Sequence, residues 1–208
     1  IKLANKECLL SSTYEPSSKT KMKLRAAPGA GTMYLQSECA EALAELFAGA
    51  EEAGYKLYLK SAYRAYKTQK TMYNNRLERN NGKDDGWVSK PGASDHQTGL
   101  GCDVVPGSWK DKSMNSNMAS TPECQWMAEH CYEYGFVIRY PEDKQDITEI
   151  NYEPWHLRYV GKEVARYIWR NGLCLEEFHE QLQAAIDAYL AAGGDARRVE
   201  DLIQTSAE

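Results

Sequence analysis

The chain has 208 residues, enough for one domain with a short appendage. A chain of this length can bury a hydrophobic core that is stable without disulfide bonds. With 42% hydrophobic and 26% charged residues, its composition is that of a globular protein. The net charge is −5 and no basic block is longer than KTKMK at 19–23, which argues against a nucleic-acid-binding protein. No apolar run approaches the ~20 residues that a membrane-spanning helix needs.

The N-terminal half predicts an irregular segment followed by two helices and a strand. Turn residues cluster in SSTYEPSSKTK and APGAGT, so residues 1–35 are expected to be irregular. Apolar residues then recur at helical spacing over 37–53, and Gly54 supplies a stop. YKLYLKSAY at 55–63 alternates with a period of two, which is typical of a half-buried strand. A second helix is predicted over 66–80, with a loop after it.

The C-terminal half mixes short strands and helices. GCDVV at 101–105 and FVIRY at 136–140 predict strands, and YEPWHLRYV at 152–160 predicts a strand or a turn. A helix is expected within 120–135, because Pro122 suits a first turn and Gly135 follows the end. Two further helices are predicted over 162–170 and 176–192. The elements show no βαβ rhythm, which favours an α+β fold over a doubly wound sheet.

The cysteines form an even set whose spacing matches neither a zinc finger nor a CxxC motif. Two interpretations of the cysteines are therefore kept: at least one disulfide, or a set of buried free thiols. Cys124 and Cys131, if they share one helix, are ~10 Å apart along its axis. Because a disulfide tolerates Cα separations only up to ~7 Å, those two are not expected to pair. The six cysteines are residues 8, 39, 102, 124, 131 and 174.

Two segments carry residue types that bind zinc. SDHQTGLGCDV at 94–104 contains His96 and Asp103, and YEPWHLRYVG at 152–161 contains His156. Imidazole nitrogen and carboxylate oxygen are zinc ligands, and three protein ligands leave one position open, as in catalytic zinc sites. The two glycines between His96 and Asp103 disfavour a helix, so we expect a turn that leads into a strand, with Asp103 near its start.

Glu153 lies three residues before His156. In an extended strand the two side chains would face opposite sides, whereas in a bend they would converge. Pro154 disfavours an α conformation at Glu153, so a local kink is expected. A carboxylate beside a metal that it does not coordinate is suited to act as a general base. The alternative is that these are ordinary core or surface residues. His130 and His179 lie in the middle of predicted helices with charged neighbours, and we interpret them as surface residues without a role.

Four motifs resemble the LAS zinc peptidases. SDHQTGLGCDV matches their S-x-H-x-x-G-x-x-x-D motif, and EPWH matches E-x-W-H. SAYRAYKTQ at 61–69 resembles S-G-Y-R-S-x-x-x-Q, and NKECLL at 5–10 resembles the N-K-x-x-P-L opening of VanY-type D-alanyl-D-alanine carboxypeptidases. The likeness runs from about residue 3 to 178, in motifs of specific order and spacing.

The resemblance implies a LAS/Hedgehog-type fold, with a small, mainly antiparallel sheet and flanking helices. It further implies one Zn²⁺ ion held by His96, Asp103 and His156, with Glu153 as the catalytic base. Arg64 would hold the substrate and stabilise the oxyanion. Three further residues would bind substrate: Gln69, Ser94 and Trp155. For Trp155, packing in the core is the alternative.

The chain departs from the family pattern at a few positions. Ala62 stands where glycine is common, and Cys8-Leu9 replaces the usual residues of the opening motif. Cys102 replaces a small apolar residue beside Asp103, and its thiol is a rival zinc ligand. Strand alternation directs Cys102 away from the face that carries Asp103, which argues against that role.

By the same resemblance the chain divides into an irregular segment (1–35) packed on a zinc peptidase domain (36–178), followed by a helical appendage (179–208). The expected substrates are peptidoglycan peptides that end in D-alanine, with no nucleic-acid partner. We expect a monomeric bacterial enzyme outside the cytoplasm, in the cell wall or tethered to the membrane, with a cytoplasmic role as the alternative.

Among activities, a D,D-carboxypeptidase is the first choice, an L,D-carboxypeptidase that trims tetrapeptides is the close rival, and a D,D-dipeptidase is third. The choice depends on loops such as 80–93 and 107–120. A non-catalytic peptide-binding module is the alternative from another class. Such a module would be expected to lose the base or a ligand, whereas all four residues are present here.

Overall fold

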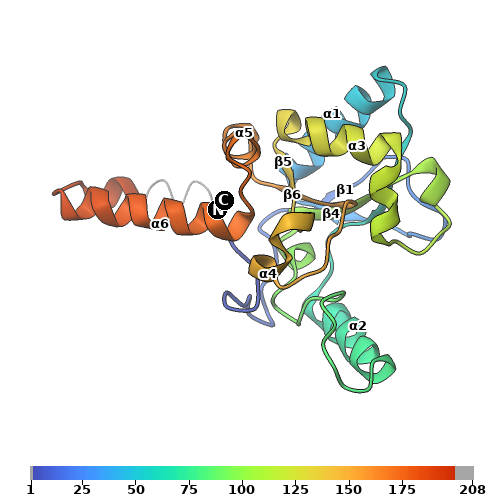
Figure 1. Cartoon of the computed structure of the whole chain (residues 1–208), viewed down its shortest axis with the longest axis horizontal. Helices are drawn as coiled ribbons and strands as arrows, with labels where there is room; N and C mark the ends of the chain where they lie inside the picture. Colours follow the sequence, from blue (N-terminus) through green and yellow to red (C-terminus); the bar gives the residue numbers. More distant parts are fainter. Residues whose placement is uncertain (1, 200–208) are drawn as a thin grey trace.

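The centre of the molecule is a four-stranded antiparallel sheet with the strand order β3-β4-β6-β5 (Figure 1). The computed structural model describes residues 2–199. A separate two-stranded pair lies in the N-terminal part of the chain. The strands are β1 (Thr20–Lys21), β2 (Tyr34–Leu35), β3 (Leu57–Ser61), β4 (Gly101–Pro106), β5 (Phe136–Ile138) and β6 (His156–Tyr159). The predicted α+β class with a small antiparallel sheet is confirmed.

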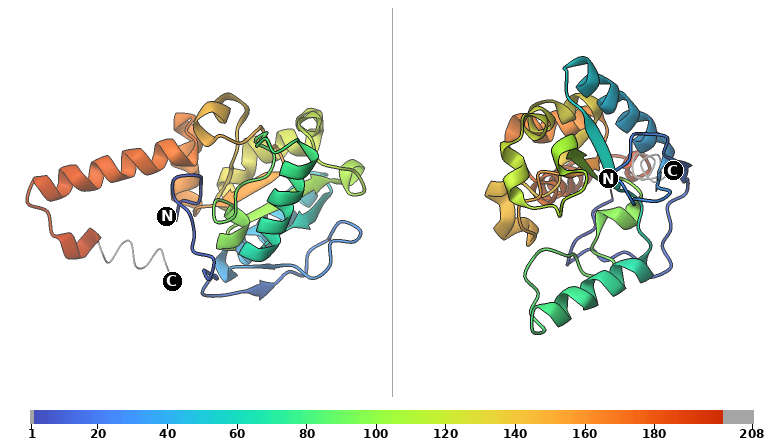
Figure 2. Two further views of the ribbon diagram at one scale, coloured as in Figure 1. Left: turned by 90° about the horizontal axis from the view of Figure 1, so that it is seen from below. Right: turned by 90° about the vertical axis from the view of Figure 1, so that its right-hand side faces the viewer.

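Helices surround this sheet, with α1, α3 and α5 on one side of it and α2 on the other in the view of Figure 1. In Figure 2, α2 crosses the front of the left-hand view and lies along the lower edge of the right-hand view. The sheet and these helices together form the frame that carries the site. The helices are α1 (Ser37–Glu52), α2 (Tyr66–Arg79), α3 (Pro122–His130), α4 (Gln145–Thr148), α5 (Lys162–Asn171) and α6 (Leu175–Ala191).

The main core lies between the sheet and helices α1 and α3. Leu43 and Leu46 of α1 are fully buried against Val104 of β4 and Leu157 of β6. Met127 of α3 closes the same cluster. This packing explains why the apolar stripe over 37–53 predicts its helix so closely, since the buried face of α1 is the stripe itself.

The N-terminal segment is more ordered than predicted. Residues 1–35 were expected to be irregular, yet β1 and β2 pair there in antiparallel register, with Thr20 opposite Leu35. Two-residue strands are too short to show a period of two, so the pattern could not reveal them. A further bridge joins Ala26 to Leu59 of β3, which ties the segment to the main sheet.

All six cysteines are free thiols, and no disulfide joins any of them. Cys8 is exposed and the other five are buried. Cys124 and Cys131 do not pair, as the helical spacing predicted. Cys102 is fully buried in the main core, on the face of β4 opposite the site, and is not among the residues that could hold a metal.

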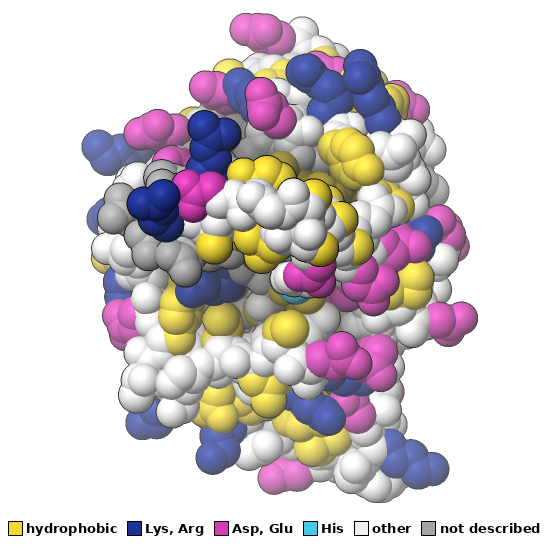
Figure 3. All heavy atoms as spheres, turned by 90° about the vertical axis from the view of Figure 1, so that its left-hand side faces the viewer, with side chains coloured by type: hydrophobic (Ala, Val, Ile, Leu, Met, Phe, Trp, Pro, Cys, Tyr) yellow, Lys and Arg dark blue, Asp and Glu magenta, His cyan; other side chains and the backbone are white. Residues whose placement is uncertain are grey.

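Helix α6 begins in the domain and then leaves it (Figure 1). Leu175 and Glu176 are buried, whereas Leu182, Tyr189 and Leu190 are exposed on the projecting part. Hydrophobic side chains accordingly face solvent at this end of the molecule (Figure 3). The boundary proposed at 178/179 falls inside α6. No helix among residues 2–199 combines the length and apolar character that crossing a bilayer requires.

Candidate metal centre and active site

His96 lies in a short 3-10 turn, η1 (Asp95–Thr98), which packs directly on the start of β4. Gly99 ends the turn in the left-handed conformation at φ 72°, which glycine adopts without strain. A Cβ atom added at Gly101 would lie 2.8 Å from the Asp95 Cβ, closer than packed carbons approach. The two glycines between His96 and Asp103 therefore allow the turn to fold back onto its own strand.

We predict that Gly101→Ala destabilises the protein by about 1–3 kcal/mol and weakens zinc binding, because the added methyl group pushes the turn that carries His96 away from β4. Thermal denaturation and a zinc titration would measure both effects. Gly107→Ala is the matched control directly after the same strand, since the nearest neighbour of its added Cβ would be Tyr58 at an ordinary 3.4 Å. Equal stability and zinc affinity in the two variants would contradict the role of Gly101.

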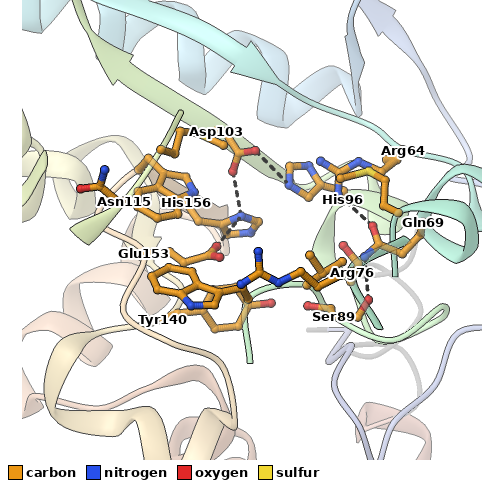
Figure 4. Close-up of a pocket in the computed structure, with 16 residues that line it drawn as sticks. Arg64, Gln69, Arg76, Ser89, His96, Asp103, Asn115, Tyr140, Glu153 and His156 are labelled. Carbon is orange, nitrogen blue, oxygen red and sulfur yellow. Dashed lines mark hydrogen bonds and ion pairs between the residues drawn. The ribbon is translucent and has the colours of Figure 1, made fainter. Parts of the chain in front are cut away.

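Strand register brings the other two predicted ligands together. Asp103 of β4 lies opposite Ser61 of β3 and His156 of β6. The Asp103 carboxylate lies between the two imidazoles, with Oδ1 3.0 Å from His156 Nδ1 and Oδ2 3.3 Å from His96 Nε2. All three side chains are buried, and Figure 4 shows them converging on one point.

The three side chains fit a zinc ion in chemistry and in spacing. One ligand atom from each of His96, Asp103 and His156 lies within 4.8 Å of the others. The His96 Nδ1 atom is 2.7 Å from the Ala62 carbonyl oxygen, to which it donates. That bond leaves the Nε2 lone pair facing the cluster, as a ligating histidine requires. Two imidazoles and one carboxylate match the donor set of catalytic zinc sites.

The charge states in the cluster also suit metal binding. Burial and the neighbouring Arg64 lower the pKa of His96, which keeps its imidazole neutral. Burial alone would raise the pKa of Asp103, but the adjacent His96 and His156 hold that pKa well below its ordinary value. A neutral imidazole and an ionised carboxylate are the forms that coordinate a cation.

Glu153 reaches the cluster through a tight turn, as the predicted kink required. The turn is closed by a 3.1 Å hydrogen bond from the His156 backbone N–H to the Glu153 carbonyl oxygen. Its carboxylate Oε2 lies 3.8 Å from His156 Nδ1. Burial and the charge of Asp103 raise the pKa of Glu153 well above its ordinary value, against the lowering effect of Arg64. The structure thus places a proton-accepting group beside the three ligand candidates.

Arg64 lies on the other side of the cluster and is held in place by its neighbours. Its Nη1 donates to Gln69 Oε1 at 2.8 Å, and its Nη2 donates to Ser61 Oγ at 3.0 Å. Gln69 in turn donates to the Ser89 carbonyl oxygen at 2.7 Å. The backbone N–H of Arg64 donates to the His96 carbonyl oxygen at 3.0 Å, which links the motif at 61–69 to the turn of His96.

All the predicted site residues line one pocket of about 380 Å³ (Figure 4). Ser94 is buried in its wall, and Trp155 both joins the main core and stacks on Trp87, at 6.4 Å between ring centroids. The cleft and core readings of Trp155 therefore both hold. Eight further residues line the pocket without a motif in the sequence that marks them: Met72, Arg76, Trp87, Val88, Ser89, Met114, Asn115 and Tyr140.

A buried ion cluster, which no sequence motif marks, lies behind His96. Asp95, the residue next to His96, accepts hydrogen bonds from Arg158 and, at 2.6 Å, from Arg139. Arg139 also pairs with Glu176 of α6 through two bonds of 2.6 and 2.8 Å. Arg158 Nη2 donates to the Lys2 carbonyl oxygen at 2.6 Å. Two guanidinium groups and two carboxylates thus balance in charge and connect both ends of the domain to the turn of His96.

The antiparallel sheet with its His–Asp–His cluster is the architecture of the LAS-type peptidases, and comparisons with known proteins agree. The model of the VanY family, D-alanyl-D-alanine carboxypeptidase, matches residues 32–162. The chain therefore belongs to the VanY family of carboxypeptidases. The Bacillus subtilis (strain 168) protein named "Putative carboxypeptidase YodJ" is 39% identical over 186 residues, which are 88% of this chain and 68% of that protein.

Solved structures of LAS-type peptidases are similar to the whole domain. The LdcB LD-carboxypeptidase is 40% identical with a TM-score of 0.80, over 86% of this chain and 84% of that one. The D,D-pentapeptidase VanY from a VanB-type vancomycin resistance cassette, solved with Zn(II), is 28% identical with a TM-score of 0.69, over 85% and 96%. The chain spans about half the length of two enterococcal D-alanyl-D-alanine carboxypeptidases that it also matches.

Proposed function

We propose that this protein is a zinc-dependent carboxypeptidase that removes a C-terminal D-alanine from peptidoglycan peptides. The observation that carries the proposal is the buried cluster of His96, Asp103 and His156, whose ligand atoms lie within 4.8 Å of one another. The cluster opens into the pocket that Glu153 and Arg64 also line. A non-catalytic binding module would not need this complete set.

His96, Asp103 and His156 would hold a single zinc ion. When bound, zinc supplies a Lewis acid for the peptide carbonyl and lowers the pKa of a water molecule. The buried carboxylate of Asp103, whose pKa is held well below its ordinary value, supplies the site with one negative charge. Removing the metal would leave that charge opposed mainly by Arg64.

Glu153 would act as the general base and then as the general acid. Its carboxylate accepts a proton from the attacking water as the new C–O bond forms at the last peptide carbonyl. It then gives this proton to the departing nitrogen as the C–N bond breaks, so that free D-alanine leaves. The raised pKa of Glu153 suits both transfers, because the group can hold the proton between the two steps.

Arg64 would bind the negative charge of the substrate. A guanidinium grips a carboxylate through parallel hydrogen bonds, and it also stabilises a developing oxyanion. Gln69 would orient this group through its 2.8 Å bond. Ser94 and Trp155 would contact the peptide from the walls of the same pocket.

We favour the L,D-carboxypeptidase activity, which trims tetrapeptides, over the D,D activity that the motifs alone suggested. The support is the similarity to LdcB, which is higher in both identity and TM-score than the similarity to the D,D-pentapeptidase VanY. The D,D-carboxypeptidase remains the second candidate, since the family model carries that description. We further propose that the enzyme works as a monomer outside the cytoplasm, where its polymeric substrate lies.

The products formed from defined muropeptides would test this proposal. We expect mass spectrometry to show loss of one alanine from tetrapeptides, with pentapeptides ending in D-Ala-D-Ala cut much more slowly. A chelator should abolish the reaction, and added Zn²⁺ should restore it. Faster cleavage of the pentapeptide would establish the D,D activity instead. If neither peptide loses alanine in the presence of zinc, the enzymatic proposal is wrong.

A further inference from the structure

The pocket contains a second guanidinium that the proposed reaction does not use. Arg76 of α2 lines the same pocket as Arg64. Its side chain is 40% exposed, whereas the Arg64 side chain is bonded into the interior through Gln69 and Ser61. Figure 4 shows the Arg76 guanidinium extending from α2 into the pocket. One arginine is therefore deep in the pocket and the other lies at its mouth.

One face of α2 forms the wall that connects the two arginines. Gln69, Met72 and Arg76 all line the pocket, and their spacing of three and seven residues places them on one helical face. Seven residues of α-helix span about 10.5 Å along the axis. Arg76 thus stands about two helical turns farther out than Gln69, which orients Arg64.

Asp85 holds the Arg76 side chain in a fixed direction. Arg76 Nε lies 2.9 Å from Asp85 Oδ2 and Nη2 lies 2.5 Å from the same oxygen. This pairing engages one edge of the guanidinium. Among residues 2–199, no hydrogen bond is formed by Nη1 of Arg76. A structural ion pair accounts for two of the three nitrogens and leaves the third able to donate to a ligand.

The partner that fixes Arg76 is itself tied to the catalytic loop. The Asp85 carbonyl oxygen accepts a 2.7 Å bond from Asn151 Nδ2, two residues before Glu153. The Asn151 backbone N–H donates to the Gly86 carbonyl oxygen at 2.9 Å. On α2, Tyr73 Oη donates to Asp84 Oδ2 at 3.1 Å. The segment 84–86 is therefore bonded both to α2 and to the loop that carries Glu153. Because these bonds already fix Asp85 and hence Arg76, little conformational entropy is lost when Arg76 binds a ligand.

The direction of the substrate indicates what lies beside Arg76. A carboxypeptidase places one terminal residue beyond the scissile bond, and all the remaining peptide leaves through the mouth. An extended peptide advances about 3.3 Å per residue, so the ~10 Å between Gln69 and Arg76 along α2 corresponds to about three residues. Arg76 would therefore lie beside residues upstream of the terminal group that Arg64 holds. A guanidinium with free N–H groups binds carboxylates through strong charge-assisted hydrogen bonds, and carboxylates are the anionic groups that a peptide carries.

We propose that Arg76 is a specificity-determining residue that binds a free carboxylate on the stem peptide, upstream of the bond that is cut. This inference rests on the proposed function. Two groups in peptidoglycan supply that chemistry. One is the side-chain carboxylate of a diaminopimelate residue next to D-alanine, and the other is the α-carboxylate of a γ-linked D-glutamate before it.

The test uses four synthetic tetrapeptides that end in D-alanine, with both upstream carboxylates free, either one amidated, or both amidated. The value of kcat/KM is measured for the wild type and for Arg76→Gln. Arg79→Gln is the matched control, because Arg79 lies on the same helix, is exposed and does not line the pocket. Ratios between peptides are compared within one variant, so a partly unfolded sample does not alter them.

We expect amidation of one carboxylate to lower kcat/KM about tenfold in the wild type and in Arg79→Gln, chiefly through KM. In Arg76→Gln the same amidation should change kcat/KM less than twofold. The carboxylate whose amidation lowers kcat/KM in the wild type but not in Arg76→Gln is the one that Arg76 binds. Discrimination that persists in Arg76→Gln, or that is absent from the wild type, overturns this inference alone. A wild type inactive on all four peptides overturns the proposed function with it.

Discussion

Glu153→Gln is expected to lower kcat by about 10²–10⁴-fold while zinc remains bound. The amide cannot accept the proton from water, but it occupies nearly the same volume in the turn before His156. The three ligand candidates are other residues, so a zinc titration should give the wild-type stoichiometry. The release of D-alanine, followed with a saturating peptide, measures the loss.

Glu142→Gln is the control for this variant. Glu142 is an exposed residue that does not line the pocket, and its replacement removes the same charge. We expect its kcat to equal that of the wild type. Near-normal turnover by Glu153→Gln would show that another group accepts the proton.

Asp95→Asn is expected to have the largest effect on stability of any substitution outside the ligands. Among residues 2–199, the variant leaves Glu176 as the one carboxylate paired with the two buried guanidinium groups of Arg139 and Arg158. Breaking a buried ion pair by removing one partner costs about 3–5 kcal/mol. At about 2–4 °C per kcal/mol for a chain of this size, the melting temperature should fall by at least about 6 °C.

Asp111→Asn provides the comparison, since Asp111 is exposed and pairs only loosely with Lys110 at 3.9 Å. Its melting temperature should stay within about 1 °C of the wild type, as surface pairs contribute little. Because Asp95 adjoins His96, we also expect Asp95→Asn to bind zinc more weakly at temperatures where it is folded. A melting temperature as high as that of Asp111→Asn would contradict the importance of this cluster.

Local sequence signals predicted the elements where one physical pattern decides the structure. The apolar stripe over 37–53 and the helix stop signal at Gly54 predicted α1, which ends at Glu52. Alternation predicted β3, although the chain leaves the regular strand at Ser61. The pairing of β3 with β4 shifts register between Leu59 and Ser61, three residues before Arg64. A pattern of side-chain polarity does not record such a shift, because it depends on the neighbouring strand.

The candidate ligands could be predicted because their motifs encode local geometry. The glycines after His96 and the proline after Glu153 restrict the backbone, and the structure has the turn and the kink that these restrictions predict. The roles assigned to these residues, and the division of the chain at 35 and 178, stay predictions. The donor types pointed to zinc, whereas the substrate came from the resemblance to a known family, since spacing alone could not supply it.

The sequence could not reveal contacts between distant charged residues. Arg139 directly follows β5 and Arg158 lies within β6, and an arginine is usually solvated. Their burial depends on Asp95 and on Glu176, which lies 37 residues beyond Arg139. Arg76 carries no signal in the sequence that marks it as a pocket residue, because only the folded chain places one face of α2 along the pocket.

Anomalous X-ray diffraction at the zinc absorption edge, from crystals of the zinc-loaded protein, tests the central claim most directly. The account predicts one strong peak about 2 Å from His96 Nε2, a carboxylate oxygen of Asp103 and a ring nitrogen of His156, with Glu153 nearby but not coordinating. A peak elsewhere, or one that lacks any of these three contacts, would contradict it.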